Sequence, residues 1–259
     1  MTMSNGTQIH NEAGGLPNEK IKPSTLMAMG ETWRNVLKVL LAEFVSTMLL
    51  IFLGCMTCVP LKGFDLPPPM YSPIGFGMVV LFNITAFGHI SGAHMNPSVT
   101  LSAVIWGKVS IPLGIMYVVA QCGGAIAGYG LLLHVSPINA SDNICVTQLH
   151  PQVTIYQGLV IEIVLSVALG FINCSVWDPV NKEKQDAIPL KFGFTIAALS
   201  LAGGPLTGAS MNPARTLGPV VWINNWESHW IYWAGPCIGG AFAPLLYKFV
   251  WADKNNKEY

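Results

Sequence analysis

The sequence predicts an all-α membrane protein with six transmembrane helices and two re-entrant half-helices, arranged as an inverted tandem repeat. Three observations lead to this prediction: a composition too apolar for a soluble domain, six apolar segments of membrane-spanning length, and a decapeptide that occurs twice. They concern, respectively, the solvent around the chain, the number of membrane crossings and the internal symmetry.

The composition indicates that lipid is the solvent. Of the 259 residues, 52% are hydrophobic and 10% are charged, and the mean hydropathy is +0.49. Soluble domains carry about 25% charged residues, so we expect the chain to reside in a lipid bilayer. The formal net charge is zero, which gives no reason to expect nucleic acid as a partner.

The cysteines give little sign of redox or metal chemistry. Cys55 and Cys58 form a C-x-x-C pattern, but it lies in an apolar segment without a second such pair or a histidine cluster. We therefore expect packed thiols rather than a metal or redox site. No nucleophile–base pair is apparent either, so we expect neither an enzyme nor a bound cofactor or metal.

Six apolar segments could cross a bilayer. At about 1.5 Å per residue, some 20 helical residues cross a hydrocarbon core of about 30 Å. The first segment begins too far along the chain, and is too long, for a secretory signal. We expect a channel domain at 34–252 between cytosolic tails at 1–33, which is polar and predicted to be disordered, and 253–259. The apolar segments lie at about 36–59, 73–90, 110–135, 156–176, 188–204 and 229–251.

The basic residues support this count of spans. With both termini in the cytosol, eleven of the thirteen lysines and arginines fall on the cytosolic side, while Lys62 lies outside and Arg215 within a repeated motif. Cytosolic loops of membrane proteins are enriched in lysine and arginine. We therefore expect a multi-pass protein with cytosolic termini. Its membrane cannot be read from the sequence, and our expectation is the plasma membrane.

Two related decapeptides reveal an internal repeat. SGAHMNPSVT occupies 91–100 and TGASMNPART occupies 207–216, with six identical positions. A glutamate in an apolar segment precedes each: Glu43 lies 53 residues before Asn96, and Glu162 lies 50 before Asn212. The repeats, about 36–135 and 156–251, each contain three spans, so the second must enter the membrane from the opposite face.

The segments after the two asparagines predict half-helices. Each continues for about ten apolar residues, and ten helical residues reach roughly 15 Å, half the hydrocarbon thickness. Asparagine followed by proline is typical of a helix N-cap and first helical residue. Two half-helices from opposite faces would meet near the midplane, where irregular backbone is tolerated if it lines a water-filled cavity. The repeat therefore predicts a pore.

The asparagines also predict ion exclusion. If the carbonyl oxygens of Asn96 and Asn212 cap their helices, the NH₂ groups face the lumen as donors. A water molecule there must turn its oxygen toward them, which interrupts a proton-conducting chain. The two helix N-termini each add roughly half a positive charge, which repels hydronium and metal cations.

Longer motifs resemble the aquaporins, of the major intrinsic protein family. The resemblance covers Val36 to Trp251 and includes AEF, GHISGAHMNPSVT, AQCGGAIAG, IEI, GASMNPARTLGP and HWIYWAGPCIGG. It implies the aquaporin-like fold and a homotetramer with one pore per protomer. The family's Asn-Pro-Ala motifs correspond to Asn96, Pro97 and Ser98, and to Asn212, Pro213 and Ala214.

The resemblance also implies roles for other polar residues. Ser98 departs from the usual alanine, and we expect a small local adjustment with an intact pore. Glu43 and Glu162 are costly in a membrane, and the resemblance implies that they accept backbone N–H groups of the re-entrant loops. For His94 we expect packing within its loop, with pH or metal sensing as the alternative.

A selectivity filter follows by spacing from the motifs. The family's four filter positions correspond to Phe76, Ser200, Ala209 and Arg215. Water-selective members typically have histidine at the Ser200 position. At other positions that differ between water channels and glycerol channels, the chain has residues of the water-channel type. These residues are Thr216, Val220, Tyr232 and Trp233.

This combination is similar to the insect entomoglyceroporins, aquaporins that conduct glycerol after losing the filter histidine. We therefore predict a channel for glycerol, water and other small neutral solutes such as urea. The alternatives are a strictly water-selective channel and a junctional or adhesive membrane protein with a vestigial pore. The intact Arg215 and both asparagines disfavour the last.

Two further expectations concern covalent chemistry. Asn139 begins an N-x-S sequon in a loop expected outside the cell, where it would be glycosylated, whereas the sequon at Asn5 lies in the cytosolic tail. Many water channels bind mercury at a cysteine in the Ala209 position. Alanine cannot do so, which leaves Cys145, in an outer loop, as the expected source of residual mercury sensitivity.

Overall fold

The structure is a computed structural model that describes residues 30–60, 70–139 and 142–252. The predicted tails fall outside this range, except that the first helix begins at Gly30, ahead of the expected domain start at 34. Within the described residues the helices run in order as follows: α1 (Gly30–Met56), α2 (Tyr71–Ser91), α3 (Pro97–Trp106), α4 (Ile111–Val135), α5 (Ile155–Trp177), α6 (Ile188–Thr207), α7 (Pro213–Ile223) and α8 (Ile231–Val250), with a 3-10 turn, η2 (Pro179–Asn181), before α6.

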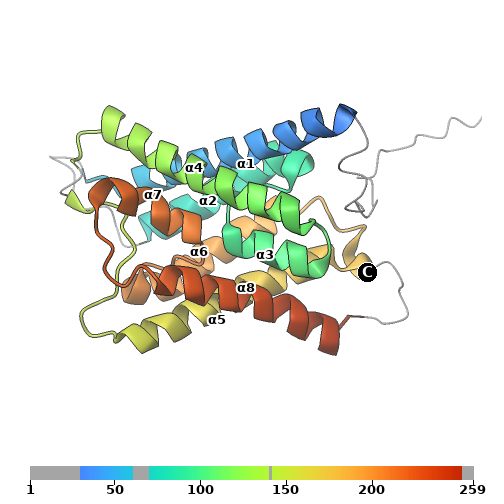
Figure 1. Ribbon diagram of the computed structural model, residues 1–259. Helices are drawn as coiled ribbons and strands as arrows, with labels where there is room; N and C mark the ends of the chain where they lie inside the picture. The colour runs from blue at the N-terminus through green and yellow to red at the C-terminus, as the bar shows by residue number, and fades with distance from the viewer. Residues whose placement is uncertain (1–29, 61–69, 140–141, 253–259) are drawn as a thin grey trace, which may run out of the picture.

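The lengths of these helices match the predicted fold class. Helices α1, α2, α4, α5 and α6 are long and apolar enough to cross a membrane. Helix α8 has 20 residues, but glycines, Pro236, Pro244 and Lys248 lower its hydropathy. It packs along α5 and completes a set of six long helices (Figure 1). Helices α3 and α7, with 10 and 11 residues, are the half-helices.

The two halves are interlocked through their half-helices. Helix α1 packs against α4 in the first half and α5 against α8 in the second, while α2 and α6 pack across the boundary. Half-helix α3 lies on α8, and α7 lies on α4, so each half-helix contacts a long helix of the opposite half (Figure 1). A Cβ atom on Gly218 of α7 would lie 2.7 Å from the carbonyl oxygen of Ala125, so a glycine permits the close contact with α4.

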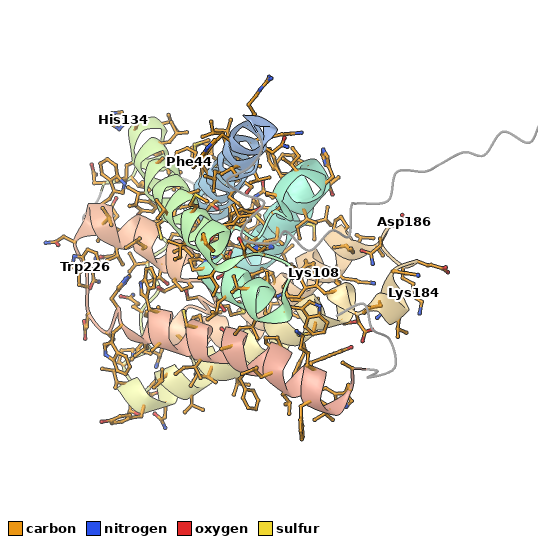
Figure 2. All side chains as sticks on the ribbon, turned by 45° about the vertical axis from the view of Figure 1, so that its right-hand side comes forward. Phe44, Lys108, His134, Lys184, Asp186 and Trp226 are labelled. Atoms are coloured by element: carbon orange, nitrogen blue, oxygen red, sulfur yellow. A yellow bond between two sulfur atoms is a disulfide. The ribbon has the colours of Figure 1, made fainter. Side chains whose placement is uncertain are left out.

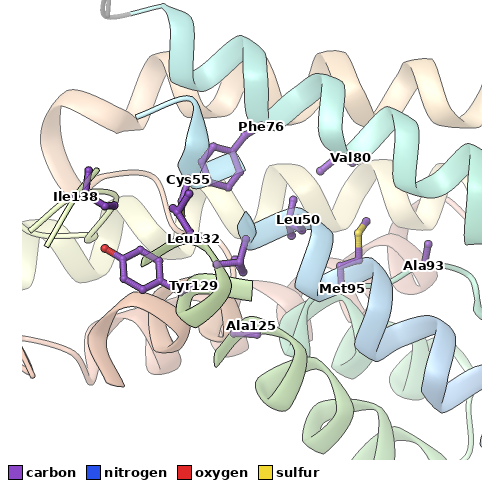
Figure 3. Packing of buried hydrophobic residues seen from close by; sticks show 12 residues of the cluster. Leu50, Cys55, Phe76, Val80, Ala93, Met95, Ala125, Tyr129, Leu132 and Ile138 are labelled. Carbon is purple, nitrogen blue, oxygen red and sulfur yellow. The ribbon is translucent and has the colours of Figure 1, made fainter. Parts of the chain in front are cut away.

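The largest apolar core joins α1, α2 and α4. Leu50, Phe76, Val80, Tyr129 and Leu132 are buried in it (Figure 3). In a bilayer the alternative to this packing is contact with equally apolar lipid tails, so close van der Waals packing, rather than removal from water, holds together the helices that carry the loops described below.

The two ends of the bundle differ in side-chain chemistry. Lys108, Lys184 and Asp186 lie toward one end, and His134 and Trp226 lie toward the other (Figure 2). The predicted cytosolic loops before α4 and α6 are thus at the same end, as expected when two spans, α4 and α5, lie between them.

Candidate functional site

The two half-helices begin at capped asparagines. The side-chain oxygen of Asn96 accepts a hydrogen bond from the backbone N–H of Ser98 at 2.8 Å. That of Asn212 accepts from the N–H groups of Ala214 at 3.0 Å and Arg215 at 3.2 Å. A proline follows each asparagine as the first helical residue, where its missing N–H costs no hydrogen bond.

The same asparagines tie the two repeats together. Nδ2 of Asn96 donates to the carbonyl oxygen of Met211, and Nδ2 of Asn212 donates to that of Met95, each at 2.8 Å. Each NH₂ group therefore donates one of its two hydrogens to a backbone carbonyl of the opposite loop. This corrects the sequence-based picture of NH₂ groups that face the lumen alone: one N–H per asparagine is structural.

The loops before the half-helices have an unusual backbone. Helices α2 and α6 are capped at their C-termini by Gly92 and Gly208, with φ of 89° and 79°. Two non-glycine residues in each loop then also have positive φ: Ala93 and Met95 at 47° and 53°, and Ala209 and Met211 at 45° and 52°. Such conformations persist when surrounding contacts enforce them. Contacts from other elements must therefore hold the loops at 92–96 and 208–212.

Glu43 holds the first loop. It is fully buried on α1, and its Oε1 accepts from the N–H of His94 at 2.9 Å and from Oγ of Ser91 at 2.6 Å. Its Oε2 accepts from the N–H of Met95 at 2.9 Å and from Nε2 of Gln121 at 2.8 Å. Hydrogen bonds to a carboxylate are about twice as strong as neutral ones.

Glu162 holds the second loop in the same way. Its Oε1 accepts from the N–H of Ser210 at 2.9 Å and from Oγ1 of Thr207 at 2.7 Å, and its Oε2 accepts from the N–H of Met211 at 2.8 Å. The repeat extends to tyrosines: the hydroxyl of Tyr117 donates to the carbonyl of Ser91, and that of Tyr232 donates to the carbonyl of Thr207.

His94 and its counterpart Ser210 close their loops onto the half-helices. Nδ1 of His94 lies 3.1 Å from Oγ1 of Thr100, and its ring meets the edge of Tyr117 with centroids 5.4 Å apart. Oγ of Ser210 lies 2.6 Å from Oγ1 of Thr216. The imidazole therefore fills, in the first repeat, the role that a smaller hydroxyl has in the second.

Ser98 is accommodated against α8. Its Oγ donates to the carbonyl oxygen of Pro236 at 2.6 Å, next to the backbone of Gly240. The additional hydroxyl thus has a partner, and it points at a helix of the other repeat.

A cavity of about 1570 Å³ runs through the bundle, and both loops line it. Its lining extends from Met70, before α2, to Asp186, before α6. All four predicted filter residues line it, namely Phe76, Ser200, Ala209 and Arg215. Both asparagines, Met95, Met211 and His94 line it as well.

Arg215 is fixed on two sides. Its guanidinium carbon lies 5.1 Å from the ring centroid of Phe76, and Nη1 donates to the carbonyl oxygen of Cys145 at 2.6 Å. One donor of the planar fork is then directed by the protein rather than by solvent, and the ring of Phe76 limits the fork on another side. Sequence reasoning found Arg215 but missed the role of the Cys145 carbonyl, because a backbone group is not visible in a side-chain motif.

The cysteine predictions were wrong at two positions. Cys55 and Cys145, 90 residues apart, form a disulfide, so Cys55 is no packed thiol and Cys145 cannot be a reactive one. Six cysteines allow 15 complete pairings, and their spacing does not distinguish among them. Cys58 remains free. It lines the cavity, with Sγ 3.1 Å from Oγ of Ser72.

Comparison with known proteins agrees with this architecture. The family model "Major intrinsic protein" matches residues 31–247. The chain is 36% identical to mouse aquaporin-4 over 233 residues, covering 88% of the chain and 72% of that protein. It is 37% identical to the lens fiber major intrinsic protein of Lithobates pipiens, covering 84% and 81%.

A solved structure has the same fold. The aquaglyceroporin from Plasmodium falciparum superimposes with a TM-score of 0.71 and 22% identity, covering 83% of the chain and 96% of that structure. The paired capped asparagines, the interlocked half-helices and these similarities agree. The chain therefore belongs to the major intrinsic protein family, the aquaporins, and is a passive channel for water and small solutes rather than an enzyme.

Proposed function

We propose that the channel conducts glycerol and water, together with small neutral solutes such as urea, and excludes protons and ions. The observation that supports this proposal is that Ser200, Ala209, Phe76 and Arg215 all line the cavity. Neither Ser200 nor Ala209 is bulky, so the constriction keeps room for a solute wider than water.

The chemistry of the four side chains suits a polyol. Glycerol has a carbon edge and a hydroxyl edge, so it needs an apolar wall opposite hydrogen-bond donors. Phe76 provides the wall, and the fork of Arg215, held by the Cys145 carbonyl, can donate to two adjacent hydroxyls. The two half-helix N-termini and the remaining N–H groups of Asn96 and Asn212 oppose cations and proton transfer.

Proteoliposome swelling tests the proposal. We expect reconstituted protein to raise both water permeability and glycerol permeability well above those of empty liposomes. Swelling in water but not in glycerol would identify a strictly water-selective channel, and swelling in neither would identify a vestigial pore of a junctional protein. An unchanged membrane conductance in the same preparation checks ion exclusion.

We further propose a homotetramer in the plasma membrane with both termini in the cytosol. In this orientation Asn139 lies outside. The residue is exposed, and its backbone N–H donates to Oδ2 of Asp142 at 2.7 Å. We expect protein made in eukaryotic cells to carry an N-linked glycan at Asn139. Peptide N-glycosidase should increase the mobility of the parent but not of Asn139→Gln, and Asn5→Gln should behave as the parent. Parent protein that the enzyme leaves unshifted would contradict the orientation.

Thiol reagents should act through Cys58. The methyl group of Ala209 cannot bind mercury, and Cys145 is bonded to Cys55, whereas Cys58 is free and lines the cavity. We expect mercury to inhibit glycerol flux slowly and in part, and Cys58→Ser to remove the inhibition. Cys122→Ser is the control, since Cys122 is free but is not among the cavity-lining residues. Strong, rapid block in Cys58→Ser would contradict this assignment.

A further inference from the structure

Residues 144–150, between α4 and α5, line the cavity next to Arg215 through Cys145 and Val146 and contact both repeats. We call residues 144–150 the strap. The hydroxyl of Tyr129 on α4 donates to the carbonyl of Ile144 at 2.7 Å, and Cys145 is bonded to Cys55 on α1. These two contacts attach the strap to the first repeat.

The strap's other contacts reach the second repeat. The carbonyl of Cys145 accepts from Arg215, and Oγ1 of Thr147 lies 2.8 Å from Oγ1 of Thr216 on α7. The N–H of His150 donates to the carbonyl of Leu206 on α6 at 2.9 Å. The strap thus joins the two repeats: a disulfide attaches it to α1 of the first repeat, and hydrogen bonds attach it to Arg215 and other groups of the second.

Cys145 has two functions in this arrangement. Its sulfur is bonded to Cys55, which is fully buried, and its carbonyl oxygen lies 2.6 Å from Nη1 of Arg215. Nη2 lies 3.5 Å from the same sulfur atom. The disulfide therefore anchors the very residue whose backbone orients the guanidinium, and Phe76 limits the guanidinium on another side.

We propose that the Cys55–Cys145 disulfide is a positioning element of the selectivity filter, which holds the fork of Arg215 in the geometry that a polyol needs. The proposal rests on the proposed glycerol function. Without the disulfide the Cys145 carbonyl can move, and the guanidinium loses a fixed acceptor. Glycerol must align two hydroxyls with the fork, whereas water passes in single file, so glycerol permeability should fall more than water permeability.

The ratio of the two permeabilities is the decisive measurement. A disulfide that closes a long loop also stabilises the fold, but a loss of folded protein lowers both fluxes together and leaves their ratio unchanged. For Cys55→Ala, Cys145→Ala and the double variant, we expect the glycerol-to-water ratio to fall on the order of threefold or more, because small misplacements of an orienting group are costly. The three values should agree, and Cys122→Ala should keep the parent's ratio.

A reductant provides the same test on protein that has already folded. Tris(2-carboxyethyl)phosphine cleaves the disulfide to two thiols: the phosphine gives two electrons and becomes its oxide, while water supplies the oxygen and both protons. Cys145 is partly exposed, which gives the reagent access. We expect the parent's ratio to fall as in the alanine variants, and the double variant to be unaffected.

A double-mutant cycle identifies the group through which the disulfide acts. If it positions Arg215, then Cys55→Ala should leave both permeabilities per folded channel unchanged in an Arg215→Val background. An unchanged ratio in the cysteine variants, or an equal effect of Cys55→Ala with and without Arg215, would overturn the proposal. If the parent carries no glycerol, the proposed glycerol function is wrong, but the role of the disulfide can still be tested. Cys55→Ala should then change water permeability per folded channel when Arg215 is present and leave it unchanged in the Arg215→Val background.

Discussion

Replacing Ser200 with histidine should reduce glycerol permeability more than a hundredfold and water permeability far less. Ser200 shares the cavity wall with Ala209, Phe76 and Arg215, and an imidazole would occupy the clearance that two small side chains leave. An added barrier of ~3 kcal/mol for glycerol corresponds to a factor of more than a hundred in rate. Water fits a single file, so the narrower filter should still admit it.

Paired water and radiolabelled glycerol fluxes at matched surface abundance provide the measurement. Ser200→Ala is the matched control, because it removes the hydroxyl without adding bulk and should retain glycerol flux. If the histidine variant carries glycerol as well as the parent does, Ser200 is not the selectivity switch and the filter assignment is wrong.

Much of the fold could be predicted because lipid imposes a simple rule on the sequence. Helices that cross a bilayer must be long and apolar, so the predicted segments at 73–90 and 110–135 differ little from α2 at Tyr71–Ser91 and α4 at Ile111–Val135. The half-helices could be predicted because Asn-Pro marks a helix start at a depth where a start is unusual.

The long-range contacts could not be predicted in this way. Helix α3 packs on α8 and α7 on α4, and the glycines that permit these contacts resemble those at any other helix crossing. The link from Cys55 through Cys145 to Arg215 depends on where a loop travels and where its carbonyl points. Neither the half-helix contacts nor this link produces a periodic pattern in the sequence, so the apolar segments and the repeated motif do not predict them.

Replacing either buried glutamate, Glu43 or Glu162, with glutamine should lower both the stability of the fold and the flux through the channel. In Glu162→Gln, one acceptor oxygen becomes an NH₂ donor. Whichever way the amide turns, it faces the N–H of Ser210 or that of Met211, which now bond to separate oxygens. Removing a buried charged acceptor costs roughly 3 kcal/mol or more. For a protein of this size, that corresponds to a fall in Tm of about 6–12 °C.

Thermal unfolding in detergent, followed by flux per folded channel, measures both consequences. Glu43→Gln should behave similarly, since its two oxygens also bond to separate backbone N–H groups, those of His94 and Met95. Glu227→Gln is the control, because Glu227 is exposed and should leave Tm unchanged. The released loop carries a residue with φ of 52° at Met211, directly before the capping Asn212. Any glutamine variant that folds should therefore also lose glycerol flux per channel. A Glu162→Gln protein with the parent's Tm and flux would mean that the loop keeps its left-handed backbone without a carboxylate.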